Sequence, residues 1–120
     1  MKPALILSAL LTVSVAAAQK TVTIGWSGAI TGPTSDAGSN YGAGVEDYCK
    51  YAQAQNMVPG VKLNCVVRDD QYNNANTQRN FEDYVGNQQA AAFLGYSTGG
   101  TLQLKSTIQE TRTLTFPCLL

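Results

Sequence analysis

The stretch VKLNCVVRDD, residues 61–70, indicates the fold more clearly than any other part of the chain. Apolar residues recur at every second position from Val61 to Val67, which is typical of a β-strand with one face turned toward a core. Pro59-Gly60 stands immediately before it and ends the preceding element. Asp69-Asp70 closes the stretch, so we predict a strand that finishes in two carboxylates.

Strands and helices are predicted to alternate on both sides of this stretch. Further strands are expected over residues 21–27, 90–94 and 113–120. Helices are expected over residues 45–56, 73–85 and 101–110, with Asn73 as an N-cap, and the glycine-rich residues 28–44 are predicted to form a loop. This β-α-β-α-β-α-β order predicts an α/β fold: an open parallel sheet with helices on both faces.

Composition excludes several classes of protein. Of the 120 residues, 44% are hydrophobic and 13% charged, and eight Lys and Arg balance eight Asp and Glu. The apolar fraction is too high for a disordered chain, and the balanced charge offers no basic surface to a nucleic acid. The sequence has no histidine, which excludes a histidine base or a histidine-ligated metal within this chain.

Residues 1–18 have the three-part layout of a secretory signal peptide. Met1-Lys2 gives a positive start, an apolar run extends from Ala4 to Val15, and small alanines follow up to Ala18. The run is shorter than the roughly 20 residues that span a bilayer. We therefore predict cleavage between Ala18 and Gln19, which leaves residues 19–120 in the periplasm or outside the cell.

Export would place Cys49, Cys65 and Cys118 in an oxidising compartment. Three cysteines allow one bridge and one free thiol within the chain. No Cys-x-x-Cys pair occurs, and with histidine also absent we expect neither a metal site nor a cofactor.

Candidate binding residues lie where the predicted strands end, because open parallel sheets bind ligands beyond those ends. Ser97, Thr98 and Gly99 precede a predicted helix, where hydroxyls, backbone N–H groups and the helix dipole would suit a carboxylate. The alternative is that Ser97 or Thr98 only caps that helix. Asp69 and Asp70 point to opposite faces, so we interpret them as acceptors that stabilise a loop. No nucleophile has a base partner, so we do not expect an enzyme.

Several short motifs occur in a familiar order. They are IGWSGAITGP at residues 24–33, GVKL at 60–63 ahead of the two aspartates, GYSTG at 95–99, and finally Glu110 and Pro117. In this order and spacing the chain resembles the periplasmic solute-binding proteins of the branched-chain amino-acid (leucine/isoleucine/valine-binding) family, which serve ABC importers.

The resemblance implies a two-lobed protein that closes on a ligand between its lobes. Residues 19–120 would supply the opening four β-α steps of the first lobe, so we expect a truncated lobe that binds poorly by itself. Ser97 falls at the family's serine contact. The other expected ligand-binding residues are Thr98, Gly99, Trp26 and Cys118. The implied partners are a small amino acid or similar solute and an ABC permease in the membrane.

The resemblance also bears on the cysteines. Some members of the family have a disulfide between the loop after the second strand and the turn after the third, at positions held here by Tyr72 and about Ser97. That bridge is therefore absent, and a Cys49–Cys65 bond is a possible substitute. Two separate buried thiols are the alternative.

Two other functions remain open at this stage. The chain could be the ligand-binding part of a periplasmic sensor for amides or amino acids, which passes its signal to a membrane partner. It could also be a small exported enzyme with a Rossmann-like sheet, although such an enzyme needs a titratable cluster at the strand ends.

The predicted signal peptide is tested by sequencing the amino terminus of the exported product. We expect the first residue to be Gln19, because the small residues before it suit signal peptidase. An exported product that still begins at Met1 or Lys2 would contradict the prediction.

Overall fold

The computed structural model describes residues 19–118. The predicted signal peptide at residues 1–18, its cleavage site after Ala18 and the last two residues of the predicted fourth strand lie outside the described residues. Within these residues the elements follow in the order β1 (Lys20–Gly28), α1 (Ser35–Ala54), β2 (Val61–Asp69), α2 (Asn74–Gly86), β3 (Ala92–Gly95), α3 (Thr98–Gln103), α4 (Lys105–Thr111) and β4 (Leu114–Pro117).

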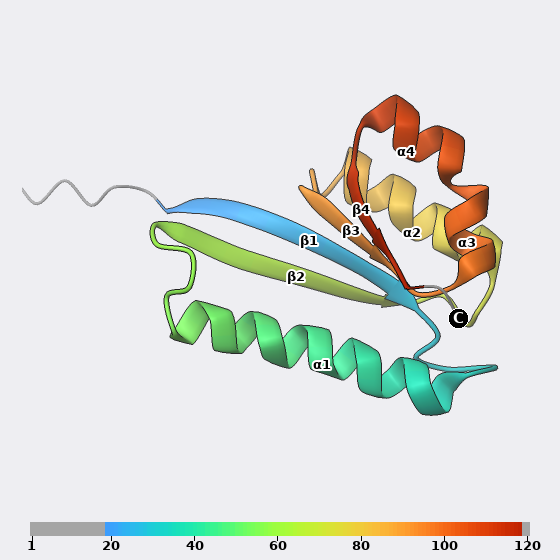
Figure 1. The fold of residues 1–120 in the computed structure, drawn as a ribbon, viewed down its shortest axis with the longest axis horizontal. Helices are drawn as coiled ribbons and strands as arrows, with labels where there is room; N and C mark the ends of the chain where they lie inside the picture. Colours follow the sequence, from blue (N-terminus) through green and yellow to red (C-terminus); the bar gives the residue numbers. More distant parts are fainter. Residues whose placement is uncertain (1–18, 119–120) are drawn as a thin grey trace, which may run out of the picture.

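The four strands form one parallel sheet in the order β2-β1-β3-β4. Trp26 of β1 lies between Val67 of β2 and Leu94 of β3 in the register. Helix α1 lies on one side of the sheet, and α2, α3 and α4 lie on the other (Figure 1). The predicted fold class is confirmed, and all four strands end at the same edge of the sheet.

Two apolar clusters hold the helices against the sheet. The cluster on the side of α2 to α4 consists of Phe81, Tyr84, Phe93 and Leu104, all fully buried. The cluster on the side of α1 consists of Trp26, Ala29 and Tyr96. Tyr84 connects the two, because its hydroxyl donates to the backbone oxygen of Trp26 at 2.6 Å. Burial raises the pKa of Tyr84, so this hydroxyl keeps its proton and remains a donor.

The predicted loop at residues 28–44 is wrong, because α1 begins at Ser35. Glycines disfavour a helix by propensity, but here they let α1 approach the sheet closely. A Cβ atom at Gly38 would lie 2.1 Å from the carbonyl oxygen of Ala29, and one at Gly42 would lie 3.0 Å from the Trp26 ring. Packing therefore outweighs propensity in this helix.

The predicted helix at residues 101–110 is also inaccurate. It begins earlier, at Thr98, and is divided at Leu104 into α3 and α4. Leu104 is buried in the cluster with Phe81, so the division turns an apolar side chain into the core.

By contrast, Asn73 caps α2 as predicted, since its Oδ1 accepts from the backbone N–H groups of Ala75 and Asn76.

A disulfide joins Cys49 of α1 to Cys65 of β2, with Cα atoms 6.2 Å apart. It ties the second half of α1 to the middle of β2. Cys118 is a free, half-buried thiol just after β4. Of the helices in residues 19–118, none combines the length and apolar character needed to cross a bilayer.

The close approach of α1 predicts a large effect of one methyl group. Gly38→Ala should destabilise the fold by about 1–3 kcal/mol, because the new Cβ atom meets backbone that cannot move aside. Gly86→Ala is the matched control, since a Cβ atom there meets nothing within 4 Å, and should change stability by less than about 0.5 kcal/mol. Urea unfolding followed by circular dichroism measures both, and equal midpoints would contradict the packing account.

Candidate ligand-binding rim

The segments that follow the four strands meet at one edge of the sheet, which we call the rim. It consists of residues 29–34, 70–73 and 96–98 together with Cys118. Backbone hydrogen bonds join neighbouring segments: Asp70 N–H donates to Gly28 oxygen at 2.9 Å, and Cys118 N–H donates to Gly95 oxygen at 2.8 Å. The rim is therefore one connected surface rather than four independent loops.

Asp70 is the buried acceptor on which much of the rim depends. Its carboxylate is fully buried and accepts hydrogen bonds from Ser27 Oγ at 2.9 Å and Thr77 Oγ1 at 2.8 Å. It also accepts from the backbone N–H of Tyr72 at 2.9 Å. A buried carboxylate is tolerated when hydrogen bonds replace its lost water. Asp70 thus joins β1, α2 and the loop after β2.

Asp69 points toward the loop after β1 instead. Its Oδ1 accepts from the backbone N–H groups of Ile30 at 3.0 Å, Thr31 at 3.1 Å and Gln71 at 3.0 Å, and its Oδ2 accepts from the Thr31 hydroxyl. Burial by itself would raise the pKa of Asp69, but these hydrogen bonds, led by that of the Thr31 side chain, together lower it. The two aspartates are loop-stabilising acceptors, as predicted.

The loop after β2 contains two successive residues in the left-handed region. Gln71 has φ 57° and Tyr72 has φ 58°, and side chains other than glycine adopt this region at a cost of order 1 kcal/mol each. The carboxylates of Asp69 and Asp70 hold the N–H groups of these residues. This pair of bonds fixes the direction in which the Tyr72 side chain leaves the backbone.

A chain of four aromatic rings crosses the rim. Trp26 stacks on Tyr41 with centroids 5.8 Å apart, and Tyr96 meets Trp26 edge-on at 5.9 Å. Tyr72 meets Tyr96 edge-on at 6.2 Å, and the Tyr96 hydroxyl donates to the Thr34 oxygen at 3.2 Å. The Tyr72–Tyr96 contact connects the turn after β2 with the turn after β3. These are the two turns between which the family resemblance led us to look for a disulfide. Tyr41 and Tyr72 are exposed and offer apolar ring surface at this edge.

The structure assigns different surroundings to the predicted ligand-binding residues. Ser97 caps α3, because its Oγ accepts from Gly100 N–H at 3.0 Å, and it is only 3% exposed. Thr98 and Cys118 are half-buried, and Gly99 is exposed. Trp26 is fully buried and packs against the rings of Tyr41 and Tyr96, so it supports the rim from within. The cap fixes the position of the Ser97 hydroxyl at the rim.

The helix that begins after Ser97 is shorter than predicted. Helix α3 has six residues, so its dipole is weaker than that of the predicted ten-residue helix. The hydroxyl of Ser97 and the neighbouring polar groups therefore matter more than the dipole.

Tyr41, Tyr72 and Tyr96 were missed as candidates in the sequence. Tyr96 is adjacent to the GYSTG serine and could have been recognised by its position after a strand. Tyr41 lay in the supposed loop, and the orientation of Tyr72 depends on a backbone conformation that its residue type does not indicate.

The described part of the chain holds no group of three or more His, Cys, Asp or Glu side chains placed to bind a metal ion. The carboxylates of Asp69 and Asp70 accept hydrogen bonds from the segments around them.

The lowered pKa of Asp69 predicts a pH dependence of stability. Its folded pKa lies below the ordinary value of 3.8, so its contribution is fully present above that value and is lost as the pH falls through the folded pKa. Asp69→Asn should therefore lower the urea midpoint at pH 6 and lower it less at pH values well below 4. An equal loss at both pH values would show that the charge of Asp69 is not what stabilises the loop.

Comparisons with known proteins identify the family. The family model described as periplasmic binding protein matches residues 21–119. A search among curated proteins found no match. Among solved structures, the chain is similar to a branched chain amino acid ABC transporter protein from Thermus thermophilus with bound valine, at 63% identity and TM-score 0.81, over 85% of this chain and 27% of that one.

Two further solved structures have the same fold. One is a possible leucine/isoleucine/valine-binding protein from Rhodopirellula baltica, at 25% identity and TM-score 0.73, over 80% of this chain and 26% of that one. The other is a branched-chain amino acid transporter substrate binding protein from Streptococcus pneumoniae in complex with isoleucine, at 17% identity and TM-score 0.75, over 82% and 28%. The chain spans about a quarter of the length of each. Since the family model covers most of the sequence, the chain belongs to the periplasmic binding protein family.

Proposed function

We propose that this chain forms the first-lobe half of the binding site of an extracytoplasmic protein that delivers branched-chain amino acids to an ABC importer. The rim provides the half-site. Ser97 and its neighbours bind the α-carboxylate, and Tyr72 and Tyr41 provide apolar surface for the aliphatic side chain. The solute is bound and released unchanged.

The observation that carries this proposal is the 63% identity with a protein that holds valine. Identity at this level over most of the chain supports a shared ligand class, and the family match supports the periplasmic setting. Export through the predicted signal peptide and delivery to a membrane permease belong to the same proposal.

The geometry of the rim also supports binding rather than catalysis. Asp69 and Asp70 each hold several backbone or hydroxyl donors, so neither is available to move a proton to or from a substrate. What remains at the surface is a set of hydroxyls, backbone and aromatic rings, which suits recognition of a small zwitterion with an apolar side chain.

One lobe alone should bind weakly, because closure of two lobes supplies the remaining contacts. We expect a dissociation constant of about 1 mM or higher for L-valine, equivalent to about −4 kcal/mol or weaker. The measurement is a titration of the ¹⁵N-labelled chain with L-valine, followed by two-dimensional NMR. Shifts should concentrate at residues 29–34, 70–73 and 96–99. L-valinamide, which lacks the carboxylate, should cause much smaller shifts at Ser97 and Gly99.

Ser97→Asp separates ligand contact from helix capping. Aspartate is as good an N-cap as serine, so α3 should remain folded, while its negative charge repels the ligand carboxylate. We expect the valine-dependent shifts to disappear in this variant. Ser106→Asp introduces the same charge at an exposed position of α4 and should leave them unchanged. Shifts located away from the rim, or equal binding by both variants, would refute the proposal.

A further inference from the structure

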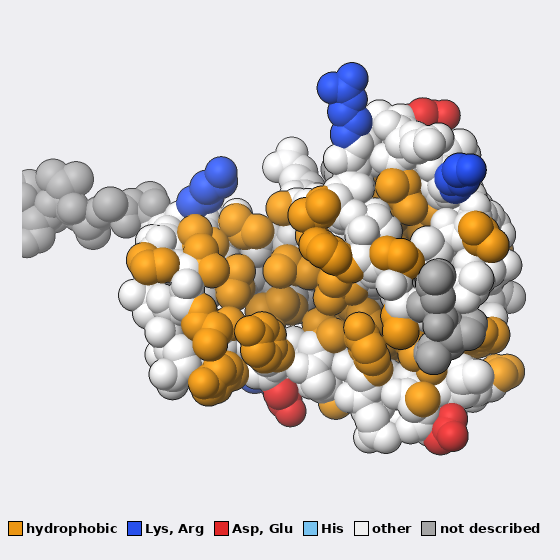
Figure 2. Space-filling model, viewed as in Figure 1, with side chains coloured by type: hydrophobic (Ala, Val, Ile, Leu, Met, Phe, Trp, Pro, Cys, Tyr) orange, Lys and Arg blue, Asp and Glu red, His pale blue; other side chains and the backbone are white. Residues whose placement is uncertain are grey.

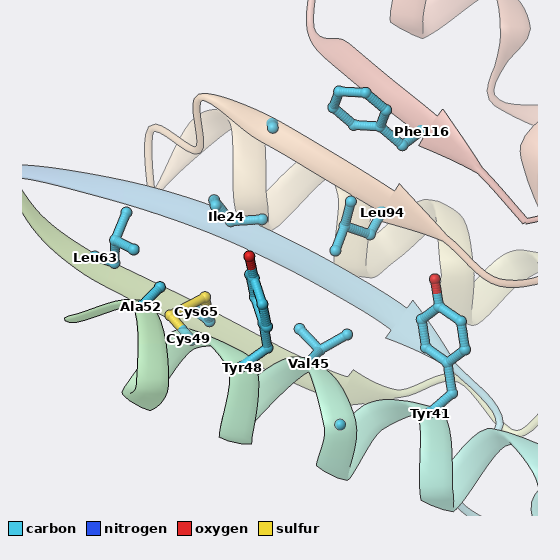
Figure 3. A pocket seen from close by; sticks show the side chains of 12 residues that line it. Ile24, Tyr41, Val45, Tyr48, Cys49, Ala52, Leu63, Cys65, Leu94 and Phe116 are labelled. Carbon is cyan, nitrogen blue, oxygen red and sulfur yellow. A yellow bond between two sulfur atoms is a disulfide. The ribbon is translucent and has the colours of Figure 1, made fainter. Parts of the chain in front are cut away.

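Two hollows of different chemistry border the helices, an apolar groove beside α1 and a polar hollow beside α2. Figure 2 shows hydrophobic side chains gathered over the groove, and Figure 3 shows Ile24, Leu94 and Phe116 facing α1 across it. Exposed apolar surface of this kind generally marks a contact with other protein, and the described residues do not show what covers it. The hollow beside α2 is polar, so it can stay open to water and bind a small solute.

The polar hollow lies where β2 ends and α2 begins. Its volume is about 260 Å³, and the residues that line it are Asp69, Gln71, Asn76, Arg79 and Asn80. It is smaller than the roughly 300–1,000 Å³ pockets that enclose drug-sized ligands. None of the lining side chains is apolar, so the hollow offers hydrogen bonds and charge but no surface for an aliphatic group. The side chains that we assign to the valine site do not line it.

Arg79 supplies a positive charge that is oriented by its neighbours. Its Nη2 donates to Asn76 Oδ1 at 2.9 Å, and Asn76 Nδ2 in turn donates to the backbone oxygen of Asp70 at 3.2 Å. These two bonds hold the guanidinium beside the loop after β2. In the described part of the chain both ion pairs are formed by other residues, so Arg79 has no carboxylate partner there. Its remaining N–H groups can bind a carboxylate, which the planar guanidinium fits well.

Acceptors and a negative charge line the same hollow. Asn80 Nδ2 donates to Ser27 Oγ at 2.9 Å and to the backbone oxygen of Asp69 at 3.3 Å, which fixes the amide group. Within residues 19–118, Asn80 Oδ1 accepts no hydrogen bond, and the side-chain amide of Gln71 makes none. Hydrogen bonds lower the pKa of Asp69, so its carboxylate stays ionised at neutral pH. An ammonium group would therefore meet an unused acceptor and an opposite charge.

We propose that this hollow is a second solute site, which binds a small amino-acid zwitterion with its carboxylate on Arg79 and its ammonium group toward Asn80 Oδ1 and Asp69. One positive and one negative side chain in the lining match the two charges of such a ligand. The absence of apolar lining favours an amino acid with a short side chain, such as glycine, over a branched-chain one. The site is separate from the valine site and does not rest on it.

A titration of the ¹⁵N-labelled chain with glycine, followed by two-dimensional NMR, tests the site. We expect saturable shifts of the amides of Gln71, Asn76, Arg79 and Asn80, with a dissociation constant below about 50 mM. Sodium acetate lacks the ammonium group and should bind about fivefold more weakly or worse. Equal binding of acetate would overturn the assignment of a zwitterion. Shifts that still rise linearly at about 100 mM glycine would show a solvated surface charge and overturn the proposal.

Arg79→Gln should raise the dissociation constant for glycine about tenfold or more, because it removes the charge that binds the carboxylate. Lys105→Gln is the matched control, since it removes one positive charge from an exposed position of α4 and should leave glycine binding unchanged. Circular dichroism checks that both exposed substitutions leave the fold intact. Equal effects of the two variants would overturn the proposal. Valine-dependent shifts at Ser97 and Gly99 should be unchanged in Arg79→Gln, so the two sites are tested independently.

Discussion

The buried carboxylate of Asp70 is the interaction on which the rim depends. It receives hydroxyl hydrogen bonds from β1 and α2 and a backbone hydrogen bond from the loop after β2. Breaking this set would leave a charge uncompensated in the interior, which typically costs several kcal/mol. One side chain therefore joins β1, α2 and the loop after β2, and the parallel sheet brings the segments after β3 and β4 beside them.

Asp69 and the aromatic rings extend this arrangement across the rim. The Asp69 carboxylate accepts hydrogen bonds from the loop after β1 and from the backbone N–H of Gln71, and it holds both in place. Tyr96 lies between Trp26 and Tyr72, and its hydroxyl reaches back to the loop after β1. Contacts of Tyr96 with both neighbouring loops therefore hold the rim in place before any ligand binds. Such preorganisation reduces the entropy lost on binding.

Much of the fold could be predicted from the sequence because local signals agreed with the tertiary structure. The alternation in residues 61–67, the cap at Asn73 and the order of strands and helices all correspond to the structure. The start of α1 could not be predicted, because Gly38 and Gly42 lower helix propensity and are justified only by contacts with Ala29 and Trp26. At the rim, the position of Ser97 at the start of a helix was predicted from its motif. Tyr72 was not, because its place depends on a left-handed backbone conformation that tyrosine as a residue type does not indicate.

The central claim is that the ligand side of this lobe is the edge where the four strands end. The most direct measurement is a crystal structure of the chain soaked with L-valine at high concentration. The account predicts electron density for the amino acid at the rim, with its carboxylate near Ser97 and its side chain against Tyr72. Density at the opposite edge of the sheet, or in the groove beside α1, would contradict it.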